Sequence, residues 1–353
     1  MSGWMVVVGL AVTPAFAQVT PAPAASAAKN LATVVVSGEL PGPGLWKVSN
    51  GDHVLWILGT LTPLPKKMHW QSKQVSDTEL AAQAVLLPPG ARMDAKVGFF
   101  GSLLLLPRLI GIRNNPDGKH LVDVLPAADY ARWQALKPRY LGTGRGVEKF
   151  RPMFAGFKLY DAAVKDAGLD DTDVASELVR KLAKQHDIPL IDTSYKFTVA
   201  DPKAALVGFR HGSMNDTACF EELLERVEHG VPRMQARANA WATGDVDALA
   251  AMPRDHADGL CTDAVASADF ARQQGLQDLP EKVAQSWMDA AGKALAQHRS
   301  TLAMLPMRDL LAQDGYLAKL RAQGYTVESP NAQDAAASAD GGDEPAPADS
   351  AAR

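Results

Sequence analysis

A hairpin signal followed by an apolar strand constrains the fold of this chain most. Residues 44–65 read GLWKVSNGDHVLWILGTLTPLP. Asn50-Gly51 is the strongest two-residue hairpin signal, so we expect one short strand on each side of it. The second strand, Val54–Leu58, is almost wholly apolar, which predicts burial on both of its faces. Two prolines follow soon after, and they prevent this strand from continuing in the centre of a sheet.

The end of this strand is the first candidate for a functional site. It leads into Gly59-Thr60-Leu61-Thr62. In open α/β sheets, ligands bind in the crevice beyond the carboxyl ends of the strands. A glycine at such a position allows the backbone to approach another group closely. We therefore expect a crevice beside Gly59 and Thr62.

Strands and helices alternate in the rest of the chain. Residues from about 126 to 300 are mostly helical by pattern, and the last part reads strand, turn, helix, strand. That order is a βαβ signature and predicts parallel pairing. The sequence thus predicts an α/β (α+β) fold with a mixed, partly parallel β-sheet, an N-terminal hairpin and a large helical insertion. The strands expected after the hairpin are Ala84–Leu87, Ile188–Ile191, Thr301–Leu305 and Tyr325–Glu328.

The N-terminus has most features of an export signal. Trp4–Val12 is a short apolar run, and Ala15-Phe16-Ala17 matches an A-x-A cleavage site, although no Lys or Arg precedes the run. The run is much shorter than the roughly 18 residues that a membrane-spanning helix needs. We expect a signal peptide at residues 1–17, cleaved after Ala17, and a periplasmic or secreted mature chain without a transmembrane span. The alternative is a cytoplasmic protein with an apolar N-terminus.

Composition indicates the remaining boundaries. Residues 18–31 are rich in Ala and Pro and are expected to be a flexible linker, and residues 329–353 a disordered acidic tail. Residues 32–328 then form a single domain. The net charge is −4, and the tail holds the excess of acidic side chains, so the part before it is neutral. A neutral domain lacks the electrostatic footprint of a nucleic-acid-binding protein.

The chain has two cysteines, Cys219 and Cys261. In an oxidising compartment two cysteines usually pair, so export predicts a disulfide between them. The alternative is two independent buried thiols.

Three segments resemble the TraB/GumN family, which is related to the Tiki-type metalloproteases. The first is Leu45-Trp46-Lys47-Val48 together with the hairpin and a strand that ends in Gly-Thr-x-x. The second is Trp241–Asp245, which reads WATGD, and the third is Leu320–Glu328, which reads LRAQGYTVE. The resemblance covers most of residues 32–328.

The resemblance implies a divalent-metal site whose ligands this chain lacks. In the proteolytic branch of the family, two facing Gly-x-x-His motifs are thought to bind the metal, because neutral imidazole ligates transition metals well. The motifs fall here on Gly59–Thr62 and on Pro306–Asp309, so both histidines are absent. A threonine hydroxyl is a poor ligand, Arg308 would repel a cation, and the single carboxylate of Asp309 does not make a site.

Two further polar positions of the family give a mixed result. The acidic residue expected after the second parallel strand is missing from Leu86–Pro89, whereas the Glu-Thr expected after a later strand is Asp192-Thr193 here. The resemblance therefore implies that no metal cofactor is retained. None of the eight histidines has His-x-His or His-Glu-x-x-His spacing, and only His69 follows the crevice closely enough to reach it.

These observations favour a catalytically degenerate member of the family that acts as a binding or scaffolding module. Its partner would be an envelope protein, a peptide or a glycan. The crevice residues on this hypothesis are Thr62, His69, Asp192, Arg308 and Asp309. One alternative is a peptidase-like hydrolase rebuilt around Thr62, Asp309 and His69. Another is an accessory role in envelope polysaccharide biology, which rests on the family association alone.

Overall fold

The computed structural model describes residues 41–66, 68–95, 110–199, 201–253 and 257–333. The expected signal peptide (1–17), the expected linker (18–31) and residues 334–353 of the expected acidic tail lie outside the described residues.

The predicted hairpin is present and opens the folded domain. β1 (Leu45–Asn50) and β2 (His53–Thr60) pair in antiparallel fashion. Asn50 pairs with His53, so the two-residue loop is Gly51-Asp52, one position later than the sequence indicated. Gly51 has a φ of +61°, a left-handed conformation that favours glycine. The shift occurs because this turn uses the left-handed glycine as its first loop residue.

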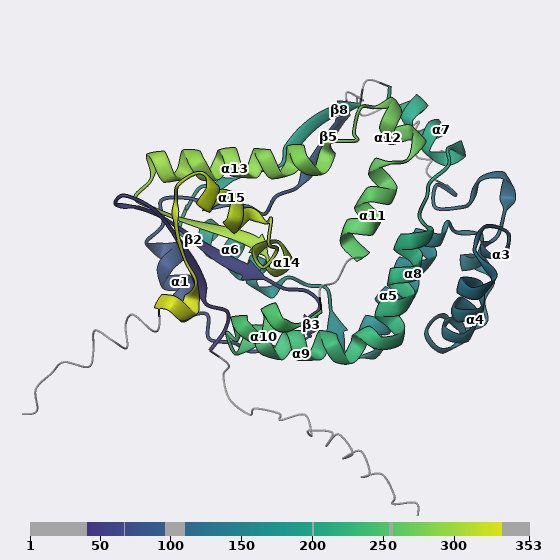
Figure 1. The fold of residues 1–353 in the computed structure, drawn as a ribbon, viewed down its shortest axis with the longest axis horizontal. Helices are drawn as coiled ribbons and strands as arrows, with labels where there is room; N and C mark the ends of the chain where they lie inside the picture. The colour runs from purple at the N-terminus through teal and green to yellow at the C-terminus, as the bar shows by residue number, and fades with distance from the viewer. Residues whose placement is uncertain (1–40, 67, 96–109, 200, 254–256, 334–353) are drawn as a thin grey trace, which may run out of the picture. The chain divides into compact units, whose positions relative to one another are not determined.

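β2 lies inside a mixed sheet of six strands, which confirms the predicted fold class. The other strands are β4 (Val85–Leu86), β7 (Leu190–Ile191), β9 (Ser300–Pro306) and β10 (Thr326–Glu328). The strand order is β10-β1-β2-β9-β4-β7 (Figure 1). β2, β9, β4 and β7 run parallel, whereas β1 is antiparallel to both β2 and β10. The carboxyl ends of the four parallel strands therefore share one edge of the sheet.

Parallel crossovers are almost always right-handed, so the strand order specifies how the covering helices divide between the two faces of this sheet. The helices involved are α1 (Lys73–Leu80), α6 (Val174–Gln185), α13 (Leu279–Gln297), α14 (Met307–Leu310) and α15 (Tyr316–Ala322). The chain moves from β2 through β4 to β7 in one direction along the sheet and returns to β9 and β10 in the other. This reversal puts α1 and α6 on one face and α13 and α15 on the other. Accordingly α1 packs on α6, and α13 packs on α15, β1 and β2 (Figure 1).

The remaining helices form the helical part of the domain (Figure 1). They are α3 (Leu121–Val124), α4 (Ala127–Leu141), α5 (Pro152–Asp166), α7 (Pro202–His211), α8 (Thr217–Glu225), α9 (Val231–Ala242), α10 (Val246–Ala251), α11 (Ala257–Ala266) and α12 (Asp269–Gln273). Short turns are η1 (Pro116–Gly118), η2 (Gly146–Lys149) and the π-helical η3 (Arg226–Gly230).

The helical part is not one uninterrupted insertion. The stretch expected to be helical also contains β7 of the main sheet and one strand of each of two small sheets. In these, β3 (Leu64–Pro65) pairs with β6 (Leu169–Asp170), and β5 (Ala91–Ala95) pairs with β8 (Tyr195–Val199). β7 falls within the strand expected at Ile188–Ile191, whereas β6 is two residues long, too short for a periodic signal in the sequence.

The first residues of the expected acidic tail pack on the domain. The side-chain amide of Gln333 donates to the carbonyl of Leu45 at 2.9 Å, and that of Asn331 donates to Asp247 at 3.0 Å. Pro330 lies against Gly44, where a Cβ atom would be 2.4 Å from its ring. These contacts place residues 329–333 with the folded domain, beyond the boundary expected at residue 329.

The predicted disulfide between Cys219 and Cys261 has bonding geometry. The two sulfur atoms are 1.99 Å apart and join α8 to α11. Both cysteines are buried in a cluster with Met153 and Leu223. Within the described ranges, helices with the length and apolar character of a membrane span are absent.

Candidate functional site

A cavity of about 460 Å³ lies at the carboxyl edge of the main sheet. Residues that follow β2, β4 and β9 form one wall, and α5, α9, η3 and the start of α6 supply the other. Its volume falls in the range of small-ligand pockets. The cavity is thus where the order of the strands predicted a crevice. The lining residues are Thr60, Leu61, Thr62, Pro63, Pro88, Phe157, Tyr160, Asp161, Asp171, Asp173, Arg226, Met234, Arg237, Pro306, Met307 and Arg308.

Thr62 and Arg308 are the two predicted site residues that line this cavity. They lie after β2 and β9, which are adjacent and parallel. The two segments predicted to face each other are therefore brought together. Gly59 allows the expected close approach, but to a helix of the chain itself, and it is not among the residues that line the cavity. A Cβ atom there would lie 2.6 Å from Met307 Cε and 3.0 Å from Leu310 Cδ1, so the glycine makes room for α14.

The carbonyl of Gly59 is held by the helical part of the domain. Trp241 Nε1 donates to this carbonyl at 2.8 Å. In the pairing of β2 with β9, Thr60 lies opposite Pro306. Proline has no backbone N–H, so β9 lacks one backbone donor at this position. Gly244, at a φ of +71°, then ends the α9 segment, and Asp245 caps α10 by accepting from the N–H of Ala248. These contacts give Trp241, Gly244 and Asp245 structural roles near the end of β2.

A matched pair of tryptophan substitutions measures this hydrogen bond. Trp241 and Trp287 are both fully buried, and each has one edge-on aromatic neighbour. Trp287 Nε1 has no hydrogen-bond partner among the described residues. We expect Trp241→Phe to lower the free energy of unfolding by about 1–3 kcal/mol more than Trp287→Phe, because only the first orphans a buried carbonyl. Chemical denaturation of both variants tests this, and equal losses would mean that the bond contributes nothing.

The other three predicted site residues are not among the residues that line the cavity. Asp192 accepts from the N–H of Ser194 at 3.1 Å and pairs with Arg92 and Lys196 at 3.2 and 3.6 Å. The hydrogen bonds from Ser194 lower the pKa of its carboxyl. Asp309 pairs with Arg308 at 3.5 Å, and His69 is exposed and outside the lining.

Thr193 supports the edge of the sheet next to Asp192. Its hydroxyl lies 2.9 Å from the carbonyl oxygen of Leu87 and 3.0 Å from that of Pro88. The hydroxyl thus donates to the segment that leaves β4. Ser286 of α13 donates to the carbonyl of Thr193 at 2.8 Å. The Asp-Thr pair after β7 therefore ties two strand ends together.

Most of the charge in the cavity comes from residues that the sequence did not identify. Asp161 is on α5, Asp171 precedes α6, Arg226 is on η3 and Arg237 is on α9. With Asp173 and Arg308, the lining holds three acidic and three basic side chains. Phe157 and Asp161 are four residues apart and share one face of α5. The acidic Asp161 on that otherwise apolar face is the feature of the sequence that could have indicated a functional position.

Each of these charges has a distinct environment. Asp173 caps α6 by accepting from the N–H of Ser176 at 2.9 Å. Arg226 is 9% exposed and lies over the ring of Tyr160 at 5.5 Å. Partial burial, with the negative charges of Asp161 and Asp170, raises the pKa of Asp171. Asp161 is half-buried and makes no ion pair or hydrogen bond within the described residues.

The comparison with known proteins settles the family. A family model described as the TraB/PrgY/gumN family matches residues 44–329. The chain belongs to the TraB/PrgY/gumN family. The match confirms the resemblance drawn from the hairpin, the Trp241–Asp245 element and the Leu320–Glu328 segment. No curated protein and no solved structure matches the chain.

The cavity of this TraB/PrgY/gumN protein does not fit a transition-metal ion. Its described lining contains neither an imidazole nor a thiolate, the side chains that such metals prefer. Thr62 stands at the first position where the proteolytic branch has histidine, and three arginines supply positive charge. The positive charge of these arginine side chains opposes binding of a cation, so the donor set does not favour one here.

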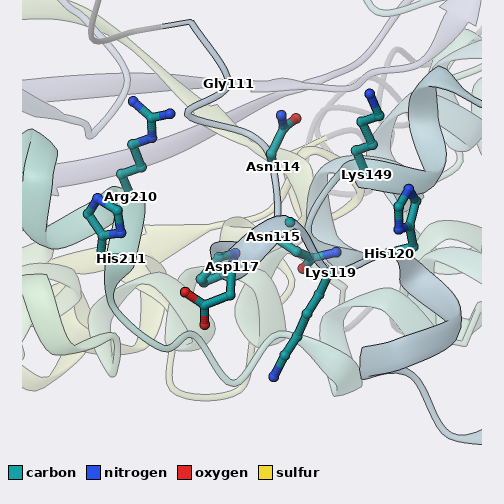
Figure 2. Close-up of a pocket in the computed structure, with 11 residues that line it drawn as sticks. Gly111, Asn114, Asn115, Asp117, Lys119, His120, Lys149, Arg210 and His211 are labelled. Atoms are coloured by element: carbon teal, nitrogen blue, oxygen red, sulfur yellow. The ribbon is translucent and has the colours of Figure 1, made fainter.

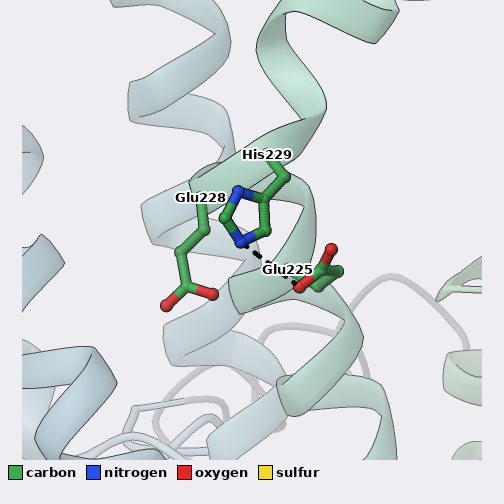
Figure 3. Close-up of side chains that lie close together, drawn as sticks. All are labelled: Glu225, Glu228 and His229. Carbon is green, nitrogen blue, oxygen red and sulfur yellow. Dashed lines mark ion pairs between the residues drawn. The ribbon is translucent and has the colours of Figure 1, made fainter. Parts of the chain in front are cut away.

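A second group of His and acidic side chains lies on α8 and η3 of this family member (Figure 3). Ligand atoms of Glu225, Glu228 and His229 lie within 4.8 Å of one another. Arg132 pairs with Glu228 at 2.7 Å, and Arg233 pairs with Glu225 at 3.4 Å. The two arginines offset the charge of both carboxylates. The group is therefore an ion-pair network rather than a metal centre.

Proposed function

We propose that this protein is an exported TraB/PrgY/gumN binding module that holds a peptide segment in the charged cavity, without metal-dependent peptidase chemistry. The observation that carries the proposal is the lining of the cavity, in which three aspartates and three arginines surround apolar and aromatic side chains. A peptide offers both charge signs and amide groups, so it can satisfy both kinds of side chain.

The scaffold around the cavity supports binding rather than hydrolysis by a metal. The edge of the sheet, the Gly59 carbonyl contact and the close packing of α14 are all in place, whereas Thr62 offers no metal-binding imidazole. Preorganised pockets bind ligands with a lower entropic cost. The cavity can therefore act as a receptor even though the family's metal ligands are absent.

Export is supported by two features of the chain. The sulfur atoms of Cys219 and Cys261 are at bonding distance, and disulfides persist in oxidising compartments such as the periplasm. The sequence of residues 1–17 has the apolar run and cleavage site of a signal peptide. Together they favour a periplasmic or secreted protein.

Substitution of Asp161 tests the peptide proposal. We expect Asp161→Asn to weaken binding of the tripeptide Ala-Lys-Ala by about 10- to 100-fold, because a charge-assisted hydrogen bond contributes about 1.5–3 kcal/mol. Binding of Ala-Ala-Ala should change less. Isothermal titration calorimetry on the full chain measures both. Asp166→Asn is the matched control, since Asp166 lies on the same helix with its side chain 61% exposed and paired with Arg139.

Two results would contradict the proposal. One is the absence of any tripeptide binding at millimolar concentration. The other is stoichiometric zinc or manganese in the purified protein, measured by elemental analysis, together with chelator-sensitive peptidase activity. The second result would show that residues outside the cavity supply the ligands.

A rebuilt hydrolase is the second candidate function, with different residues from those first expected. His69 and Asp309 do not line the cavity, whereas Asp161 and Asp171 do. The raised pKa of Asp171 beside a second carboxylate is the pattern of an acid and base pair. Metal-independent cleavage of a bound tripeptide, lost in Asp171→Asn, would favour this candidate. The charged lining gives no preference for a neutral glycan, so the accessory role in polysaccharide biology has no support from it.

A further inference from the structure

A second cavity, of about 420 Å³, lies in the helical part of the domain and has a basic lining (Figure 2). Its residues come from the loop around η1, from the end of η2 and from the last turn of α7. They are Gly111, Asn114, Asn115, Pro116, Asp117, Gly118, Lys119, His120, Lys149, Arg210 and His211. It shares no lining residue with the cavity at the edge of the sheet.

Three permanent cations and one carboxylate line this second cavity. Lys119, Lys149 and Arg210 are exposed and form no ion pair within the described residues. Figure 2 shows Arg210 and His211 on one side of the cavity and Lys149 and His120 on the other, with Asn114 between them. Asp117 is the single acidic side chain among the described residues that line it. The cavity therefore has an excess of positive charge that approaches a bound group from two sides.

A buried arginine holds the two sides together. Arg151 is 3% exposed, and its Nη2 lies 2.7 Å from the carbonyl of Phe209, 3.2 Å from that of Arg210 and 3.1 Å from that of Gly212. The backbone N–H of Arg151 donates to the carbonyl of Arg113 at 2.8 Å. The end of α7 and the loop before η1 are thus joined through one residue.

The opposite wall is fixed by Asn115. Its backbone N–H donates to the carbonyl of Lys149 at 2.8 Å, and its side-chain amide donates to the carbonyl of Phe150 at 2.8 Å. Asn114 also forms a β-bridge with Phe150. The basic side chains therefore extend from a backbone framework that is hydrogen-bonded before any ligand enters.

The contacts of Arg151 bear on the function of the neighbouring cations. Basic residues in the last turn of a helix usually complement its terminal carbonyls. Here the guanidinium of Arg151 already donates to carbonyls at the end of α7. Arg210 and His211 are therefore not needed for that purpose, and their side chains remain available to the cavity.

We propose that this cavity binds a small polyanion with at least two phosphate or carboxylate groups. Cations on opposite walls match two separated acidic groups, and arginine presents a donor fork that fits the oxygens of either group. The volume suits a small molecule rather than a single inorganic ion. This inference is independent of the peptide proposal, because it concerns different residues.

Titration of the full chain with inorganic pyrophosphate tests the proposal. Isothermal titration calorimetry at about 10 mM ionic strength, where the Debye length is about 30 Å, keeps the electrostatic contribution large. We expect one binding event per chain. Lys149→Gln and Arg210→Gln should each weaken binding by about tenfold, the effect of losing one charge-assisted contact. Asp117→Asn should tighten it, because it removes the opposing charge.

Arg139→Gln is the matched control, since Arg139 is 70% exposed and lies outside the cavity. The affinity of this variant for pyrophosphate should stay within about twofold of that of the unaltered protein. In a second titration citrate replaces pyrophosphate. The ligand that binds with the lower Kd identifies the preferred acidic group, carboxylate or phosphate. The proposal fails if pyrophosphate and citrate both leave the heat unchanged, or if Arg139→Gln weakens binding as much as Arg210→Gln. Failure here would leave tripeptide binding at the other cavity unaffected.

Discussion

Loss of the disulfide between Cys219 and Cys261 is expected to lower the free energy of unfolding by about 4 kcal/mol. The two cysteines are 42 residues apart in the sequence, and cross-linking a loop of that length removes conformational entropy from the unfolded chain. Urea-induced unfolding of the oxidised protein and of the double variant Cys219→Ala/Cys261→Ala measures the difference in the free energy of unfolding.

The surroundings of the bond suggest a consequence for the cavity at the edge of the sheet. The cysteines pack in a cluster that includes Phe157 and Tyr160, and both of these side chains also line that cavity. Weakening the cluster should therefore reduce tripeptide affinity as well as stability. A reducing agent should destabilise the unaltered protein and leave the double variant unchanged. Equal stability of oxidised and reduced protein would mean that the thiols are independent.

The sheet was predictable because its signals are local. An Asn-Gly pair between apolar runs, and a strand, turn, helix, strand order near the C-terminus, each specify their own neighbours. Topology then places the ends of β2 and β9 side by side, so the positions of Thr62 and Arg308 follow from the pattern. The loop of the hairpin was misplaced by one residue, because both Asn50-Gly51 and Gly51-Asp52 satisfy the turn rules.

The composition of the cavity was not predictable, because its charges come from distant segments. Asp171 and Asp173 are two residues apart, and both lie just before the start of α6. Asp173 does cap α6, whereas Asp171 lines the cavity. Arg226 and Arg237 lie on η3 and α9, and nothing in their local pattern connects them to β2. Only the packing of the helical part against the edge of the sheet brings these side chains together.

One buried carboxyl in the core has no ion-pair partner among the described residues. Glu79 on α1 is fully buried, and neither oxygen of its carboxyl has a hydrogen-bond partner among the described residues. Burial raises its pKa from the ordinary 4.5 to about 7. At a pH between these two pKa values, the Glu79 carboxyl is protonated in the folded protein and ionised in the unfolded chain. Raising the pH across this interval therefore favours unfolding.

Glu79→Gln should remove this pH dependence. A pKa unit corresponds to about 1.4 kcal/mol, so ionisation of Glu79 is expected to cost the folded state about 3 kcal/mol above pH 7. The variant should match the unaltered protein to within about 1 kcal/mol at pH 4.5, where Glu79 is protonated, and exceed it by about 3 kcal/mol at pH 8. Chemical denaturation at a series of pH values measures the difference.

The control for this experiment lies on the same helix. Asp77 is 60% exposed at its side chain and pairs with Lys73, so Asp77→Asn should change stability by less than about 1 kcal/mol at every pH above 5. A stability difference between Glu79→Gln and the unaltered protein that stays constant from pH 4.5 to pH 8 would contradict the argument. It would mean that the carboxyl is solvated when ionised, and that water reaches it between α1 and α6. The same titration thus decides whether the packing of α1 on α6 stays dry at neutral pH.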